Sequence, residues 1–223
     1  MKKLLIAMAF AGLSLSSMAQ ETADPTLKYS VATNSFWSNW FVQGNFTWTA
    51  FYSNEEKGMG WTKSPVKDFR RDMGFSAAIG KWFTPGIGIR AKFNGIWGKD
   101  VPKENAYNTC MHNKYWNLQG QALFNLSNLF CGYSPTRVWN ISPYAGIGLV
   151  RNMSLNSYCM AGSAGILNQW RVSKRVQINL DVQYNIMGDD FEGVDESLAY
   201  GGHEKRNHDQ IVSAEIGLTY NLG

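Results

Sequence analysis

The sequence predicts an all-β fold: an eight-stranded antiparallel transmembrane β-barrel with short periplasmic turns and long extracellular loops. Three observations predict it. The N-terminus resembles a secretory signal, and long segments alternate apolar and polar residues. The connections between these segments are alternately short and long. Successive side chains of a strand point to opposite faces, so one face can meet lipid while the other fills the barrel.

The N-terminus has the pattern of a signal peptide. A basic start precedes an apolar run over residues 4–15, and residues 17–19 offer a small-x-small cleavage site. The run is shorter than the about 20 apolar residues that a membrane-spanning helix needs. We therefore expect residues 1–19 to be a signal peptide, residues 20–35 a periplasmic N-terminal segment and residues 36–223 the barrel, located in the bacterial outer membrane.

Composition agrees with a membrane barrel. Aromatic residues make up 14% and charged residues 17% of the 223 residues, yet mean hydropathy is only −0.28. Lipid-facing and lumen-facing residues of a barrel cancel in such an average. The net charge of +4 falls to +2 without Lys2 and Lys3, and the basic residues form no stripe. No nucleic-acid partner is expected.

Five segments alternate clearly. In residues 176–186, Val, Ile, Leu and Tyr oppose Gln, Asn and Asp. The first strand is expected to put Ala50 on its lipid face, and the third to put Trp97 there. The other clear strands span about residues 40–50, 87–97, 116–124 and 212–222.

Three strands are weaker because glycines and small residues blur the alternation. They cover about residues 71–83, 141–151 and 158–172, and the last of these could be read in either register. A soluble sandwich also alternates, but its strands usually have about 5–6 residues, whereas a membrane strand needs about 9–11. The polar faces here carry amides and hydroxyls more than Lys and Glu, which favours the membrane barrel.

The connections alternate in length. Residues 84–86 and 173–175 form tight turns, whereas residues 54–67, 99–113 and 188–209 are long and polar. Outer-membrane barrels keep short turns in the periplasm and long loops outside, and an even strand number places both termini in the periplasm. Residues 127–140 are expected to be a longer periplasmic connection with a helical turn.

Aromatic residues lie near both ends of the predicted strands, where two interfacial girdles are expected. The periplasmic group is Trp40, Phe83, Trp139, Trp170 and Tyr220, and the outer group is Tyr52, Trp97, Trp116 and Tyr184.

The sequence resembles a divergent branch of the OmpA-type outer-membrane proteins. The resemblance rests on GKWFTPGIG at residues 80–88, on the run from Phe124 through residues 137–144, and on residues 165–168 with 173–176. It implies an OmpA/OmpX-like barrel. Members usually continue into a periplasmic domain that grips peptidoglycan, but this sequence ends at Gly223 directly after its last strand. We therefore expect a barrel without the cell-wall anchoring role.

The interior of an eight-stranded barrel is only wide enough for its own side chains. Arg90 and Lys92 are expected to point inward from the third strand, Asp181 from the seventh and Glu215 from the eighth. Buried charges are costly unless paired, so these four should form a salt-bridge network. It could serve as a structural plug or as a selectivity filter.

The sequence offers little for catalysis or metal binding. His203, Glu204, His208 and Asp209 could supply a base with its carboxylate, or a weak metal site, in one loop, and His112 lies in another. No nucleophile is tied to them by spacing. Cys110, Cys131 and Cys159 lack metal-site spacing. Cys110 and Cys159 are expected near the same membrane face, so one alternative is a disulfide between them and the other is three inert thiols.

We therefore expect a protein that is not an enzyme and has no catalytic, cofactor or metal site. The predicted role is structural, in envelope integrity and surface interaction. Its partners would be outer-membrane lipids and an extracellular ligand reached through residues 54–67, 99–113 and 188–209, and the protein would be a monomer. A narrow, porin-like channel for small solutes is the alternative, and an outer-leaflet lipid-modifying enzyme the third hypothesis.

Overall fold

The structure, a computed structural model, describes residues 38–52, 71–96, 100–104, 110–154, 156–188 and 208–222. Side chains are described at these positions except residues 71, 96, 100–104 and 110–113. The elements within these ranges are β1 (Trp40–Tyr52), β2 (Arg71–Trp82), β3 (Ile87–Ile96), β4 (Asp100–Glu104), β5 (Cys110–Phe124), α2 (Leu126–Cys131), β6 (Trp139–Asn152), β7 (Ser157–Arg171), β8 (Val176–Met187) and β9 (Asp209–Asn221).

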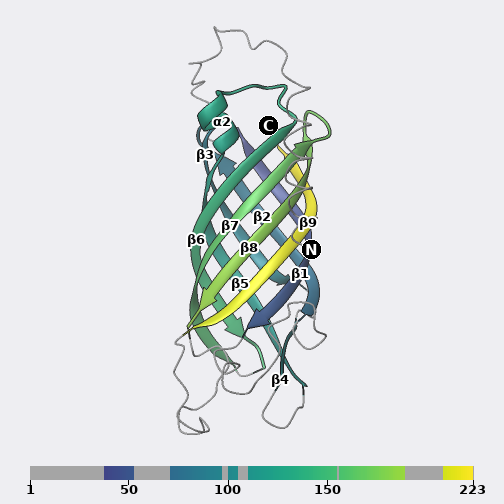
Figure 1. Ribbon diagram of the computed structural model, residues 1–223, viewed down its shortest axis with the longest axis vertical. Helices are drawn as coiled ribbons and strands as arrows, with labels where there is room; N and C mark the ends of the chain where they lie inside the picture. Colours follow the sequence, from purple (N-terminus) through teal and green to yellow (C-terminus); the bar gives the residue numbers. More distant parts are fainter. Residues whose placement is uncertain are drawn as a thin grey trace, which may run out of the picture.

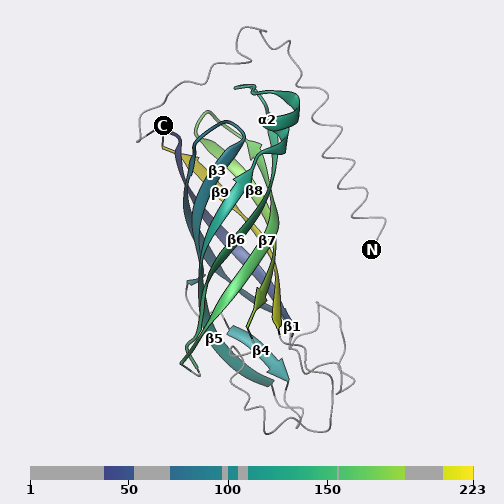
Figure 2. The same cartoon turned by 90° about the vertical axis from the view of Figure 1, so that its left-hand side faces the viewer.

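Eight of the described strands close into a barrel. Their order is β3-β2-β1-β9-β8-β7-β6-β5, each neighbouring pair is antiparallel, and pairing of β3 with β5 completes the ring. Figures 1 and 2 show the strands running obliquely around one cylinder. The barrel strands are 10 to 15 residues long, which is enough to cross a bilayer. The predicted eight-stranded antiparallel barrel is confirmed.

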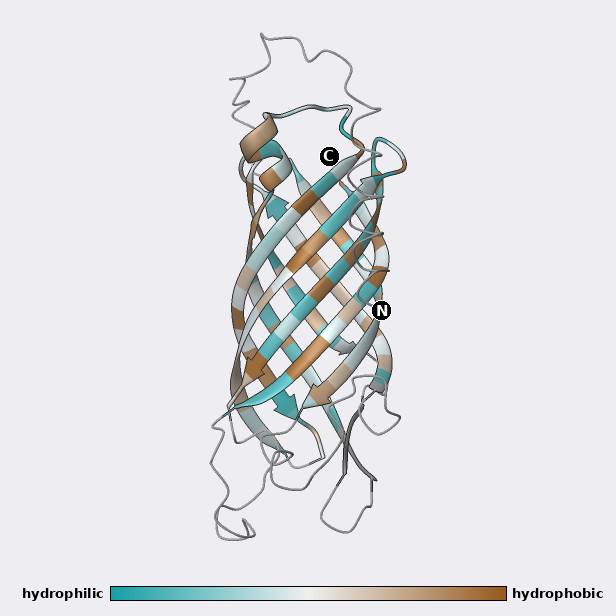
Figure 3. Ribbon diagram, viewed as in Figure 1, coloured by the Kyte–Doolittle hydropathy of each residue, from teal (hydrophilic) through white to brown (hydrophobic). Residues whose placement is uncertain are grey.

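The described strands turn apolar side chains outward and polar side chains inward. On β8, Leu180, Val182 and Tyr184 are exposed, while Asp181 and Gln183 between them are fully buried. Figure 3 shows the same alternation of brown and teal along the strands. A wall of exposed aliphatic and aromatic residues this extensive is stable against lipid, not water.

Two details of the predicted faces are now settled, and a third lies outside the described residues. In β7, Leu167 points inward and is fully buried, whereas Asn168 lies on the outer face, and this exchange is why the sequence fitted either register. Ala50 lies on the predicted face of β1 but is buried there, between the larger Trp48 and Tyr52 on the same face. Trp97 lies outside the described residues. The last described residue of β3, Ile96, follows a bulge at Gly95, whose φ is +98°.

Both tight turns are stabilised by a hydroxyl side chain. The Thr84 hydroxyl accepts hydrogen bonds from the backbone N–H groups of Gly86 and Ile87, at 3.3 and 2.9 Å. Ser173 does the same for Arg175 and Val176, at 3.3 and 3.1 Å. Such local bonds favour turns over continued strand.

The predicted helical turn between the fourth and fifth barrel strands is α2. The side chain of Asn125 caps it by accepting from the N–H of Asn128 at 3.0 Å, and Gly132 follows it with a φ of +72°. Helix α2 lies at the same end of the barrel as both tight turns (Figure 2). No described helix is long and apolar enough to span a membrane.

One predicted loop is partly wrong. Residues 99–113 were expected to be a loop, but β4 pairs with the first five residues of β5, from Asp100↔Lys114 to Glu104↔Cys110. Backbone pairing therefore continues beyond the barrel ring, because a hairpin satisfies the N–H and C=O groups of an otherwise unpaired β5. Several predicted segments lie outside the described residues: the signal peptide (1–19), the segment 20–35, and the connections at residues 54–67 and 189–207. The predicted bounds of the barrel, 36–223, stay a prediction.

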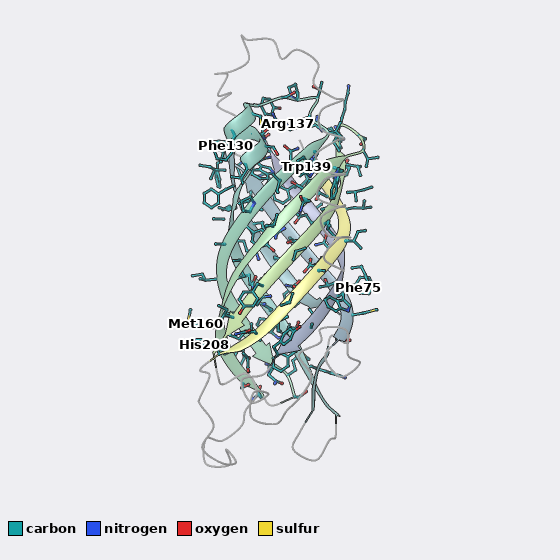
Figure 4. The ribbon with its side chains drawn as sticks, viewed as in Figure 1. Phe75, Phe130, Arg137, Trp139, Met160 and His208 are labelled. Atoms are coloured by element: carbon teal, nitrogen blue, oxygen red, sulfur yellow. The ribbon has the colours of Figure 1, made fainter. Side chains whose placement is uncertain are left out.

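Aromatic residues lie near both ends of the barrel wall. At the α2 end, Trp139 and Trp170 are direct partners across β6 and β7, and the side chain of Phe130 projects away from α2 (Figure 4). At the opposite end, Trp116 stacks on Phe93 with 5.9 Å between ring centroids. This distribution fits two interfacial girdles.

Candidate functional site

The structure brings the four predicted lumen charges together. Arg90 and Lys92 are two residues apart on β3 and point to the same side, while Asp181 and Glu215 are direct partners across β8 and β9. Two neighbouring anions of one wall thus face two cations of another. All four side chains are fully buried.

Lys92 is the centre of this lumen charge network. Its Nζ lies 2.9 Å from Oδ2 of Asp181 and 3.0 Å from Oε2 of Glu215. Arg90 Nη2 lies 2.7 Å from the same Oδ2 of Asp181. Two positive and two negative charges make the network neutral, which is the condition under which buried charges are stable.

Polar neighbours satisfy Arg90 almost completely. Its Nε donates to Gln121 at 2.6 Å and its Nη1 to Gln43 at 2.8 Å. The Tyr144 hydroxyl donates to Oδ1 of Asp181 at 2.6 Å, and the guanidinium lies 4.5 Å from the Tyr144 ring centroid. Arg90, on β3, is therefore held by contacts from four other strands, β1, β5, β6 and β8.

Amides extend the network toward both ends of the lumen. Toward the outer end, Gln183 and Gln121 both donate to Oε1 of Gln119. The Nε2 of Gln119 donates in turn to Asn185 at 2.7 Å. Toward the α2 end, Asn45 donates to Glu215 at 3.1 Å and accepts from Asn179. Amides can donate and accept at once, so they relay hydrogen bonds along the interior.

An apolar layer lies on either side of the lumen charge network, toward each end of the barrel, and the sequence reasoning missed both layers. The inner apolar layer, at the α2 end, consists of Phe41, Leu123, Tyr144 and Leu167. The outer apolar layer consists of Phe51, Tyr115, Val150, Cys159, Ala161, Met187 and Ile211. The signal in the sequence that could have found these residues is their alternation with outward-facing ones. Phe41, for instance, is two residues before Gln43 and therefore points inward as Gln43 does.

Inward glycines make room for the large lumen side chains. A Cβ at Gly148 would overlap the Leu118 carbonyl oxygen and lie 2.7 Å from Cγ of Gln119. A Cβ at Gly165 would overlap the Tyr144 hydroxyl. Glycine and large residues therefore alternate across neighbouring strands, which fills the interior.

The histidine hypothesis gains no support from the described residues. His208 is exposed beside the buried Asp209, whereas His203, Glu204 and the side chain of His112 lie outside them. Among the described residues no group of three His, Cys, Asp or Glu side chains could hold a metal ion. Cys131 lies on α2 and Cys159 at the other end of the barrel, as expected, and the side chain of Cys110 is outside the described residues.

A closed, oblique antiparallel barrel with an apolar outside and an ion-paired inside is the architecture of a transmembrane β-barrel. The chain is a bacterial outer-membrane β-barrel protein. It is 31% identical over 150 residues to outer membrane protein 40 of Porphyromonas gingivalis (strain ATCC BAA-308 / W83). The match covers 65% of this chain and 38% of that relative, so the chain spans well under half of the relative's length. This confirms the predicted resemblance to outer-membrane proteins.

Solved outer-membrane barrels are also similar. Neisserial surface protein A is 11% identical, with a TM-score of 0.49, over 83% of this chain and 98% of its own. OprG of Pseudomonas aeruginosa is 12% identical, with a TM-score of 0.44, over 82% and 95%. Ail of Yersinia pestis is 10% identical, with a TM-score of 0.40, over 82% and 98%. The chain matches no protein-family model.

Proposed function

We propose that this protein is a non-conducting structural component of the outer membrane, which supports envelope integrity and meets extracellular ligands through its outer connections. The observation that carries the proposal is the filled interior. The lumen charge network occupies its middle, and an apolar layer lies on either side of it. An ion crossing the barrel would have to displace buried side chains at three successive levels.

The apolar layers support a non-conducting barrel over a channel as much as the buried charges do. Moving an ion past desolvated aromatic and aliphatic groups is unfavourable because nothing there replaces its hydration. Phe51 and Tyr115 stand at the outer level, and Phe41 and Leu123 at the inner level. The interior therefore favours a plug over a selectivity filter.

A narrow channel for small solutes is the second candidate, and the polar column between the two apolar layers favours it. Planar-bilayer recording of the purified protein separates the two. The structural proposal expects no steady single-channel current, and reproducible steps would support the channel. A lipid-modifying enzyme would instead alter the lipid composition of cells that express it.

Envelope integrity is tested in a deletion strain. We expect increased sensitivity to detergent and increased leakage of periplasmic proteins, both reversed by the wild-type gene. Complementation with a variant that folds but lacks the outer connection at residues 188–207 separates the two parts of the proposal. Restored integrity with lost surface binding would assign the connection to ligand contact and the barrel to the envelope.

A further inference from the structure

We propose that an outward-facing site at the outer end of the barrel binds the phosphate group of a glycolipid in the outer leaflet. The site consists of two cations, Arg151 and Lys114, with Trp116, Asn156 and Tyr158 around them. We call it the Arg151 site. The inference goes beyond the proposed function, because it holds whether or not the barrel conducts.

Strand register places these side chains together on the outer face. Arg151 is the direct partner of Trp116 on β5 and of Tyr158 on β7. Lys114 precedes Trp116 by two residues, so it shares that face and is the diagonal neighbour of Arg151, about 7–8 Å away between backbones. Lys114 is exposed and Arg151 is half-buried.

The guanidinium of Arg151 is held in place by its neighbours. Arg151 Nη2 donates to Oδ1 of Asn156 at 2.8 Å, and its guanidinium lies 5.1 Å from the Tyr158 ring centroid. Tyr158 packs edge-on against Trp116, with 6.5 Å between centroids. This ordering lowers the conformational cost of binding a ligand.

The turn beside the site fixes the backbone of Lys114. The Lys114 N–H donates to the Ser154 hydroxyl at 3.0 Å, and its carbonyl accepts from the Met153 N–H at 2.6 Å. Residues 153–156 make the connection between β6 and β7 short, unlike the long polar stretches that join the other strands at this end. The short connection leaves the barrel wall accessible from the side at this point.

Arg151 lacks a counter-ion among the described side chains. Arg90 and Lys92 meet carboxylates in the lumen, whereas no described carboxylate pairs with Arg151. The direct backbone partner of Lys114 is Asp100, whose side chain is outside the described residues. Arg151 also retains Nη1 without a described hydrogen-bond partner. A guanidinium beside an ammonium is a strong arrangement for a phosphate, through charge-assisted hydrogen bonds.

The height of the site identifies the source of the phosphate as a lipid headgroup. Below it on the same face lie Leu118, Leu149 and Met160, all exposed, and Met160 points away from the wall (Figure 4). Apolar side chains followed by a level of aromatic rings and cations is the order expected from hydrocarbon to headgroup. The long polar connections mark this end as extracellular, so the headgroup belongs to the outer leaflet.

Lipid A, the bis-phosphorylated glycolipid of that leaflet, is the probe. The full barrel, purified in a neutral detergent, is titrated with lipid A, and bound lipid is counted by native mass spectrometry. We expect the double variant R151Q/K114Q to bind about tenfold more weakly, since charged hydrogen bonds are lost. K174Q/R175Q, which removes two exposed cations from the turn at the other end, should bind like the wild type.

Comparisons between lipids and variants decide the inference. R151K should retain part of the affinity that R151Q loses, and the melting temperature without lipid A should be the same for all variants, which shows that the fold is intact. Undiminished lipid A binding by R151Q/K114Q would overturn the proposal. Equal affinity for phosphatidylglycerol, or displacement of lipid A by millimolar inorganic phosphate, would also overturn it. No conductance is measured, so the proposed function stands or falls separately.

Discussion

Asp181 and Glu215 are direct partners across β8 and β9, so two buried carboxylates stand side by side in one wall of the barrel. Lys92 contacts both, at 2.9 and 3.0 Å, and Arg90 contacts Asp181 at 2.7 Å. Like charges in neighbouring positions would repel each other without these cations. The pairing therefore ties β3 to the opposite wall and predicts how the barrel responds when one partner is removed.

Glu215→Ala should destabilise the barrel by about 3–5 kcal/mol, and somewhat less if lumenal water reaches the site, because Lys92 loses one of its two carboxylates. Unfolding in urea, in lipid vesicles, measures this. Ser213→Ala, on the same face of β9, removes a hydroxyl without removing a charge and should cost much less. Equal losses in the two variants would show that the ion pair contributes little.

The same variant tests whether the charge network acts as a gate. We expect the bilayer conductance of Glu215→Ala to stay at the wild-type level, because both apolar layers remain in place. A rise in conductance accompanying the loss of stability would instead identify the ion pairs as the main barrier to permeation.

Arginine on the lipid face should be costly at mid-strand. Leu180 and Ile216 are direct partners, 38% and 59% exposed, and we expect Leu180→Arg or Ile216→Arg to cost roughly 2–4 kcal/mol near the bilayer centre. Gln183→Arg and Ser213→Arg place the same charge in the packed lumen, where space and the neighbouring charges set the cost. The free energy of unfolding is measured for each variant in bilayers of two thicknesses. The thickness should change the cost of the lipid-facing variants alone.

Gly148→Ala should destabilise the barrel, because the new Cβ would overlap the Leu118 carbonyl oxygen and crowd Gln119. Overpacking of this kind costs about 1–3 kcal/mol. Gly162→Ala, on the outer face of the neighbouring strand, is the matched control, as nothing lies within 4 Å of its Cβ position. Thermal unfolding followed by the gel shift of the folded barrel compares them. A neutral Gly148→Ala would mean that the backbones of β5 and β6 separate easily.

Topology is tested by labelling intact cells with an impermeant maleimide, in a background without the three native cysteines. Lys57→Cys and Ser197→Cys, in the long connections, should be labelled. Pro85→Cys, in the tight turn at the α2 end, should react only after lysis. Labelling at position 85 in intact cells would invert the barrel and place the Arg151 site in the inner leaflet.

The sequence by itself determined the eight barrel strands and, except in β7, their faces. Alternation in residues 176–186 identified Asp181 as inward and Leu180 as outward, because strand geometry allows two directions only. It also found the helical turn that became α2 and the inward charges Arg90, Lys92, Asp181 and Glu215. Lengths of connections separated one end of the barrel from the other.

Tertiary structure decided what those inward residues meet. Contacts such as Arg90 with Asp181, or Lys92 with Glu215, cross the lumen, and their geometry depends on the register of every strand between them. The apolar layers were hidden for the same reason: Phe41, Leu123 and Leu167 come from three strands and form a layer only when the ring closes. Local pattern fixes the direction of a side chain, but its height in the barrel, and hence its partners, follows from closure.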